Sequence, residues 1–437
     1  MEWEQLLSLK RYGDKVQRLR REQNDLRLGF EVDYDRIIFS AAFRSLQDKT
    51  QVVPFSKTDF VHTRLTHSLE VSVVGRSLGR MVGSALLERY PHLQKVLGYQ
   101  ATDFGSIVAT ACLAHDIGNP PFGHSGEQAI GSFFSSGEGK AFSTALSEVE
   151  YADLCHFEGN ANGLRLLTQS RPGTPGGLRL SYATLGTFIK YPKASLPKKP
   201  TSHVADKKFG YFQTEAPFFK ELTTTLGMVA EGSVKRHPLT YLVEAADDIC
   251  YTIIDFEDGI NLGWISESYA LEYLINLVRD RLDAKKYAEL KDRPQRLGYL
   301  RALAINTLIH EAAELFLEHE AALLNGAFPH ALLEKSKYKA QIDDIIALSV
   351  ANIYKAPEVI EKEIIGYKVL RTLLEHYVTA AHRSFHNKAT ALDRMVLDTL
   401  PPGVPLITDS YYETLLNATC YVASLSDGKA MGLAKNF

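Results

Sequence analysis

An apolar run that ends in a histidine–aspartate pair most constrains how this chain can fold. The run Ala-Cys-Leu-Ala leads into His115 and Asp116, and a glycine and two prolines then break the chain before Phe122. A buried polar group without a partner costs roughly 2–7 kcal/mol. Neutral histidine and ionised aspartate are both ligand types for divalent ions. A bound metal ion is therefore the natural partner, and the fold must bring further ligands to it.

Helical periodicity dominates the chain and predicts an all-α fold. We expect helices over 34–48, 107–117 and 238–258, and a long one that starts at Thr63 or Thr66. The residues of the long helix expected to face inward are Leu69, Val73, Val74, Leu78, Val82 and Leu86. Asp33 and Ser125 are the expected N-caps of the first helix and of one that follows position 125. The segment Lys190–Lys208 holds six lysines and three prolines and should be an exposed loop. A short strand is expected over 51–55, within at most a short β-hairpin near 51–62.

Composition bounds the class of protein. The 437 residues exceed the usual size of one core. A net charge of −3 excludes a nucleic-acid-binding polycation, so any affinity for phosphates must come from local clusters. No run of about 18 apolar residues predicts a membrane span, and the first residues lack the pattern of a signal peptide. The four separated cysteines are expected to pack as free thiols, and we expect a cytoplasmic protein.

The predicted 238–258 helix carries polar groups on one face. Asp247, Tyr251 and Asp255 follow each other at spacings of four residues and therefore share a face, while the other faces are apolar. Polar groups on a buried helix need partners. One carboxylate for an ion, and a tyrosine with a second carboxylate for a hydroxylated ligand, would satisfy that need. A solvated stripe of Asp247, Asp248 and Asp255 is the alternative that the spacing leaves open.

The motifs in order resemble a known superfamily. His67, the pair His115-Asp116, and Asp247 resemble the H…HD…D signature of the HD phosphohydrolases, although His67 taken alone is more often a capping or core residue. Longer segments resemble the bacterial dGTP triphosphohydrolase family: 43–52, 63–71, 114–124 and 244–249. The resemblance implies an HD-domain helical bundle elaborated with additional helices. We divide it into a phosphohydrolase core over 1–262 and a C-terminal helical region over 263–437.

The resemblance also implies a reaction and a metal site. The reaction is hydrolysis of dGTP, and of other deoxynucleoside triphosphates (dNTPs), to deoxynucleoside and inorganic triphosphate. The implied ligands of one divalent ion are His67, His115, Asp116 and Asp247. Nitrogen and oxygen ligands without thiolate suit Mn²⁺ or Mg²⁺, with Fe²⁺, Co²⁺ and Ni²⁺ as further candidates. His124 and Glu127 match the family's catalytic pair, in which the carboxylate orients the imidazole for general acid catalysis; the alternative for His124 is a helix cap.

The substrate-binding residues follow mainly from the same resemblance. Gln51 and Val52 match positions packed against the deoxyribose. Tyr251 and Asp255 match sugar-contacting residues, with Asp255 accepting a hydrogen bond from the 3′-hydroxyl. The phosphate site is expected to take Arg64, whose guanidinium precedes His67 by one helical turn, together with the family-matched His156, Lys190 and Tyr191.

Two other readings stay open at this point. Another HD phosphohydrolase, such as a nucleoside monophosphatase or a cyclic-nucleotide phosphodiesterase, would share the ligand set but not the 43–52 and 119–127 motifs. A non-catalytic sensor of nucleotides or single-stranded DNA would use a degenerate site. The resemblance further implies a homo-oligomer, a hexamer or tetramer, and makes contact with single-stranded DNA conceivable.

Overall fold

Helices dominate the structure, which is a computed structural model that describes residues 1–16, 18–23, 29–52, 61–171, 173–230, 232–401, 404 and 406–437. Within these ranges there is one two-stranded sheet, in which β1 (Val229–Ala230) pairs antiparallel with β2 (Ser233–Val234). The prediction of an all-α fold is confirmed. The predicted strand over 51–55 is wrong at Gln51 and Val52, which are in no strand, and residues 53–60 of the expected hairpin lie outside the described residues. The flanks Thr50 and Thr63 form an isolated antiparallel bridge.

The α-helices of the described chain are α1 (Trp3–Leu6), α2 (Gly29–Ile38), α3 (Ala41–Arg44), α4 (Arg64–Arg89), α5 (Pro91–Lys95), α6 (Ala101–Ala114), α7 (Gly123–Ser135), α8 (Glu148–Cys155), α9 (Gly159–Thr168), α10 (Tyr182–Phe188), α11 (Ala216–Thr225), α12 (Thr240–Asn261), α13 (Glu267–Val278), α14 (Ala284–Glu289), α15 (Arg293–Glu318), α16 (Glu320–Leu324), α17 (Lys339–Ser349), α18 (Pro357–Phe385), α19 (Ala391–Asp398), α20 (Tyr411–Ser424) and α21 (Asp427–Ala434). Shorter 3₁₀ segments cover Arg20–Glu22, Ser45–Asp48, Glu138–Ala145, Val204–Asp206, Gln213–Glu215, Arg279–Arg281 and Leu332–Lys335, and a π-helical turn covers Val350–Tyr354.

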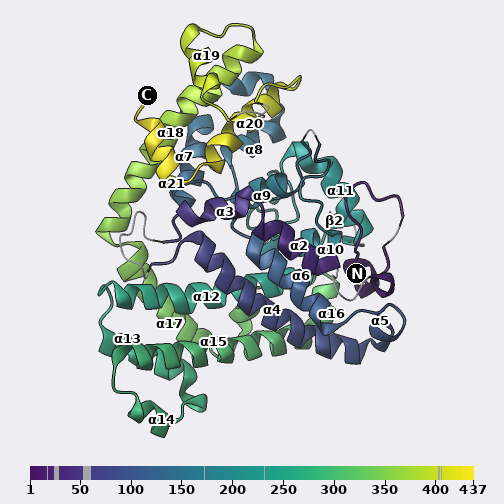
Figure 1. Ribbon diagram of the computed structural model, residues 1–437, viewed down its shortest axis with the longest axis vertical. Helices are drawn as coiled ribbons and strands as arrows, with labels where there is room; N and C mark the ends of the chain where they lie inside the picture. The colour runs from purple at the N-terminus through teal and green to yellow at the C-terminus, as the bar shows by residue number, and fades with distance from the viewer. Residues whose placement is uncertain are drawn as a thin grey trace.

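The helices form two groups that the long helix α18 connects (Figure 1). In the lower group α12, α13 and α15 run roughly side by side, and α4 crosses them; the upper group contains α7, α8, α19, α20 and α21. Two hydrophobic cores correspond to these groups, and each takes residues from both sides of position 262. The division of the chain at that position stays a prediction. None of the described helices is both long and apolar enough to cross a membrane.

Helices α4 and α6 pack through a stripe of glycines. Of the two predicted starting residues, Thr63 is the N-cap of α4, and it forms a capping box with Thr66. A Cβ atom at Gly79 would lie 2.6 Å from the carbonyl oxygen of Phe104, so only glycine allows this approach. The predicted inward face is confirmed for Val74, Leu78, Val82 and Leu86, which are buried beside the glycines. It is wrong for Leu69 and Val73, which are 38% and 53% exposed. Helix α6 also begins earlier than the predicted 107–117.

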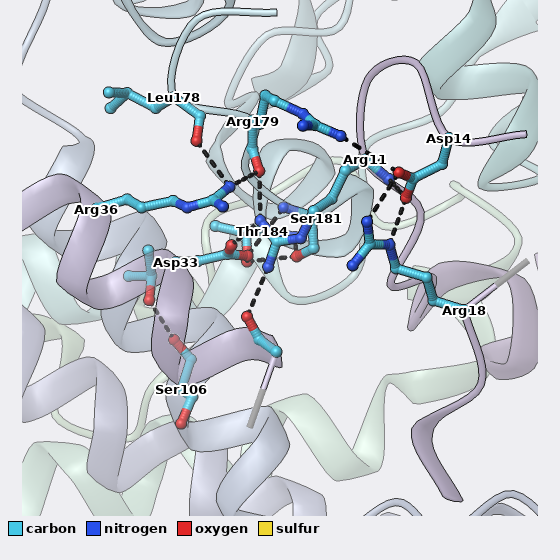
Figure 2. A network of polar contacts seen from close by, with 12 residues as sticks. Arg11, Asp14, Arg18, Asp33, Arg36, Ser106, Leu178, Arg179, Ser181 and Thr184 are labelled. Atoms are coloured by element: carbon cyan, nitrogen blue, oxygen red, sulfur yellow. Dashed lines mark hydrogen bonds and ion pairs between the residues drawn. The ribbon is translucent and has the colours of Figure 1, made fainter. Parts of the chain in front are cut away.

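The predicted helix over 34–48 is broken into α2, α3 and a 3₁₀ turn. Ser40 starts α3 by accepting a hydrogen bond from the Phe43 amide. Asp33 is not an N-cap: it lies inside α2, fully buried, where it pairs with Arg11 and accepts hydrogen bonds from Ser181 and Thr184. Figure 2 shows these residues converging from distant segments. Tertiary pairing therefore overrides the local capping preference of the aspartate.

Two further local predictions are corrected. Helix α7 begins at Gly123 after Phe122, whose φ is 60°, and Ser125 lies in the first turn and donates to the Phe122 carbonyl (2.9 Å) instead of capping the helix. The segment 190–208 is only partly exposed, because Tyr191 and Ser195 are buried. Packing of its first residues against the core explains the difference.

Candidate active site

Three helices bring the four predicted metal ligands together. His67 lies in the first turn of α4, His115 and Asp116 follow the end of α6, and Asp247 lies in α12. The distances between ligand atoms are 3.1 Å from His67 Nε2 to Asp247 Oδ1, 3.5 Å from His115 Nε2 to the same oxygen, and 3.6 Å from His115 Nε2 to Asp116 Oδ1. Such spacings suit atoms that each lie about 2.1 Å from one shared cation.

Neighbouring groups orient the donor atoms. The Nδ1–H of His115 donates to the Cys112 carbonyl at 2.6 Å, which leaves Nε2 facing the cluster. This arrangement is the usual support of a metal-binding imidazole. The side chain of Asn119 donates to Asp116 Oδ1, and Arg64 pairs with Asp116 Oδ2 at 2.8 Å. These contacts fix the orientation of His115 and Asp116 in the cluster.

The cluster lies in a cavity of about 550 Å³, within the usual range for a small-molecule site. The predicted site residues that line it are Gln51, Val52, Arg64, His67, His115, Asp116, His124, Glu127, Lys190, Tyr191, Asp247, Tyr251 and Asp255. His156 is the exception: it is half-buried at the end of α8 and does not line the cavity. Burial, together with the charge of Lys198, lowers the pKa of His156.

The pair His124 and Glu127 lies at the rim of the cavity, in the first turns of α7. His124 Nδ1 and Glu127 Oε2 are 2.9 Å apart, and the Gly159 amide donates to the other Glu127 oxygen at 2.8 Å. The His124 side chain is 82% exposed, so the imidazole is reachable from solvent. Burial opposes ionisation of Glu127, but the His124 hydrogen bond and the charge of Lys208, 3.6 Å away, lower its pKa. Glu127 thus holds the ring as a carboxylate.

A buried ion network supports the cationic side of the cavity. Arg236, 2% exposed, binds both oxygens of Glu244 at 2.7 and 3.3 Å and donates to the Lys190 carbonyl at 2.8 Å. Lys190 Nζ lies 3.4 Å from Glu244 and 4.0 Å from Asp247. Burial would lower the pKa of Lys190, but these carboxylates outweigh it and raise the pKa. The ammonium group is therefore held charged beside the histidine–aspartate cluster.

The polar face of α12 forms another wall. Asp255 is 1% exposed, so the solvated stripe is wrong for this residue, and Asp247 and Asp248 also line the cavity. The Tyr354 hydroxyl donates to Asp255 Oδ2 at 2.8 Å, and its ring stacks on Tyr251 with 5.4 Å between centroids. Asp255 Oδ1 has no hydrogen-bond partner in the described part of the chain. Burial raises the pKa of Asp255 to about 7.

Sequence reasoning missed several residues around this site. Tyr354 arrives from the C-terminal third, where no motif marked it, and Lys208 is one of six lysines in a loop that gave no reason to choose it. Lys49 is 2% exposed and donates to the Asn119 carbonyl at 2.6 Å; burial lowers its pKa to about 7. Lys49 lies inside the 43–52 motif, which could have indicated a role at the site, whereas no sequence motif includes Tyr354.

The fold and this cluster define an HD-domain protein, and the family model described as HD domain matches residues 64–163. A deoxyguanosinetriphosphate triphosphohydrolase-like protein of Synechocystis is 41% identical over 98% of this chain and 97% of its own length. One from Pseudomonas aeruginosa is 40% identical over 100% and 98%. The deoxyguanosinetriphosphate triphosphohydrolase of Yersinia enterocolitica is 34% identical over 80% and 76%. This chain belongs to the deoxyguanosinetriphosphate triphosphohydrolase family, as its motifs predict.

Proposed function

We propose that this chain hydrolyses deoxynucleoside triphosphates to deoxynucleoside and inorganic triphosphate, with one divalent ion bound by His67, His115, Asp116 and Asp247. The observation that carries the proposal is the convergence of these ligands in one cavity with cationic and hydroxyl-binding side chains. The HD domain itself implies a divalent ion, and the nitrogen and oxygen donors favour Mn²⁺ or Mg²⁺ as its identity. When bound, the ion supplies Lewis acidity at the α-phosphate and lowers the pKa of water.

Arg64 and the lysines bind and orient the triphosphate. The side chains of Arg64, Lys190, Lys207 and Lys208 line the cavity. Arg64 Nε is buried and has no hydrogen-bond partner among the described residues, so the guanidinium keeps a donor for a phosphate oxygen. These cations compensate the charge of a substrate that the chain as a whole, at net −3, would not attract.

His124 acts as the general acid. Water attacks the α-phosphorus, the bond from phosphorus to the 5′-oxygen breaks, and the electron pair goes to that oxygen. Protonated His124 gives it the proton from Nε2, because Nδ1 is held by Glu127. Such a step typically contributes about 10²–10⁴-fold. The attacking water loses its proton to solvent, from which His124 is reprotonated.

The deoxyribose contacts Gln51, Val52, Tyr251 and Asp255. The orphaned Asp255 Oδ1 accepts from the 3′-hydroxyl, which supplies the partner that a buried carboxylate oxygen requires. Val52 lines the cavity, and a tight apolar contact between its side chain and the 2′-carbon would exclude a ribose hydroxyl. We therefore expect preference for deoxynucleotides.

The test is incubation of the purified chain with each dNTP and Mn²⁺ or Mg²⁺, followed by chromatography of the products. Nucleoside and triphosphate in equal amounts support the proposal, and their absence in His115→Ala ties turnover to the ligand set. Release of orthophosphate from a monophosphate, or opening of a cyclic nucleotide, would instead identify another HD phosphohydrolase. Binding without turnover under every divalent ion would contradict enzymatic activity. Equal rates with dGTP and GTP would refute the sugar assignment.

We also propose a cytoplasmic homo-oligomer, a tetramer or hexamer. Exposed apolar side chains on α18, among them Ile360, Ile364 and Ile365, support association. Light scattering of the purified chain measures the mass, and a monomer would contradict this proposal. Contact with single-stranded DNA stays a prediction, to be measured by binding of a labelled oligonucleotide across a salt series.

A further inference from the structure

One carboxylate at the start of the last helix joins the two chain segments that flank the cavity. Asp427 is the first residue of α21 and is 2% exposed. Its Oδ1 accepts from the Phe122 amide at 3.1 Å, and its Oδ2 accepts from the Thr50 amide at 3.0 Å and from the Thr50 hydroxyl. Hydrogen bonds to an ionised acceptor are roughly twice as strong as neutral ones. Asp427 therefore ties two distant loops to one point.

Each loop carries part of the cavity wall. Thr50 directly precedes Gln51 and Val52, and all three line the cavity. Phe122 is the N-cap of α7, two residues before His124, and its φ of 60° is uncommon for a residue with a side chain. A strained backbone persists only where its surroundings hold it. The Asp427 carboxylate on the Phe122 amide is one such restraint.

A second restraint on Phe122 comes from α18. A Cβ atom at Gly366 would lie 2.3 Å from Phe122 Cγ, so the aromatic ring packs directly on the glycine backbone. Helices of the C-terminal third thus hold this residue from two sides.

Among the contacts that flank Asp427, those of Asp48 fasten the same segments without reaching either wall. Asp48 accepts from the Ser426 hydroxyl at 2.6 Å and from the Gly428 amide at 3.3 Å. The Lys49 ammonium group donates to the Ala423 carbonyl at 3.0 Å and to the Asn119 carbonyl at 2.6 Å, so Lys49 is a second tie between the two sides of the cavity. Asp48 thus links the 45–52 segment to the start of α21, as Asp427 does, yet within the described part of the chain its hydrogen bonds reach no cavity-lining residue. This difference makes Asp48 a matched control.

We propose that Asp427 is a positioning residue of the active site, which holds the Thr50–Val52 segment and the turn from Phe122 to Glu127 in one fixed relation. The sugar-contacting residues Gln51 and Val52 and the general acid His124 then face the same bound substrate. This inference rests on the proposed function, and Asp427 itself touches no substrate. In Asp427→Asn the side chain keeps its shape, but its NH₂ group faces either the Thr50 or the Phe122 amide. The NH₂ group and that backbone amide are both donors and cannot hydrogen-bond to each other, so the segment that carries the amide is no longer held.

The test compares D427N with D48N in the full-length protein. Hydrogen–deuterium exchange of peptides over 49–52 and 120–124 measures the two walls directly and needs no turnover. Steady-state kcat and KM for dGTP and GTP with Mn²⁺ measure the consequence. We expect D427N to speed exchange in at least one wall tenfold or more and to lower the ratio of kcat/KM for dGTP over GTP, or kcat itself, by tenfold or more. For D48N, the exchange rates, the ratio of kcat/KM for dGTP over GTP, and kcat should each stay within about twofold of the wild-type values.

Unchanged exchange in both walls overturns the proposal. So does faster exchange accompanied by kinetic constants equal to those of D48N, since the carboxylate would then be only structural. A wild type that turns over no nucleotide contradicts the proposed function instead, and the exchange comparison then decides by itself whether Asp427 holds the walls. Should D427N fail to fold, D427E replaces it. The glutamate carboxylate lies one methylene further from the backbone, so D427E should change the exchange rates and kinetic constants in the same direction as D427N but less.

Discussion

The substitution Gly79→Ala, which adds one methyl group, tests how closely α4 and α6 pack. A Cβ there would lie 2.6 Å from the Phe104 carbonyl oxygen and 2.9 Å from Gly105 Cα. These are backbone atoms that no rotamer change can move, so the helices must separate by roughly 1 Å to regain ordinary contact. Overpacking costs about 1–3 kcal/mol, and alanine returns about 1 kcal/mol of helix propensity. With the overpacking cost at its upper end, because the clash is with backbone, we expect Gly79→Ala to lower the free energy of unfolding by about 2 kcal/mol.

Gly298→Ala is the matched control. Gly298 lies within α15, and a Cβ there meets nothing within 4 Å. The same substitution should therefore stabilise the chain by about 0.5–1 kcal/mol. The two variants then differ by about 3 kcal/mol, more than a hundredfold in the folding equilibrium. Urea titration followed by circular dichroism compares their midpoints. A Gly79→Ala midpoint at or above that of the wild type would refute the close packing.

Three further perturbations address the ion network, a buried acid and the metal. Arg236→Met removes the bidentate partner of the buried Glu244, which then keeps its 3.4 Å contact with Lys190, and should cost up to about 3–5 kcal/mol in urea unfolding. Adding Glu244→Leu should restore part of this loss, and equal stabilities of the single and double variants would contradict this. Burial raises the pKa of Asp153 from 3.8 to about 6. The native state then holds more protons than the unfolded state between these values, so stability falls as pH rises through them. Asp153→Asn should gain up to about 3 kcal/mol over the wild type from pH 4 to pH 7, and a pH-independent difference in urea midpoints would exclude this. Chelation of divalent ions should lower the thermal midpoint, and Mn²⁺ at a hundred times its Kd should return about 2.7 kcal/mol; a wild type as insensitive as His115→Ala would argue against the site.

Local pattern was sufficient to predict the helices that carry the site. The Thr63 cap of α4, an apolar α6 ending at His115, and the polar face of α12 all depend on residues within a few positions of each other. Spacing of four residues places Asp247, Tyr251 and Asp255 on one face wherever the helix packs. The choice of His67 as a ligand needed the family resemblance, because one histidine in a first turn is more often a cap. The catalytic and binding roles remain predictions.

Only the tertiary structure decided what surrounds these helices. Aspartate is a common N-cap residue, yet Asp33 is buried inside α2, where it pairs with Arg11 and accepts a hydrogen bond from the Ser181 amide. Tyr354 reaches Asp255, and Asp427 reaches Thr50, across long separations in the chain. Periodicity records which face of a helix is apolar, not which distant segment will cover it. Such contacts form when separate helices pack together, and the energy that selects them is not present in any local stretch of sequence.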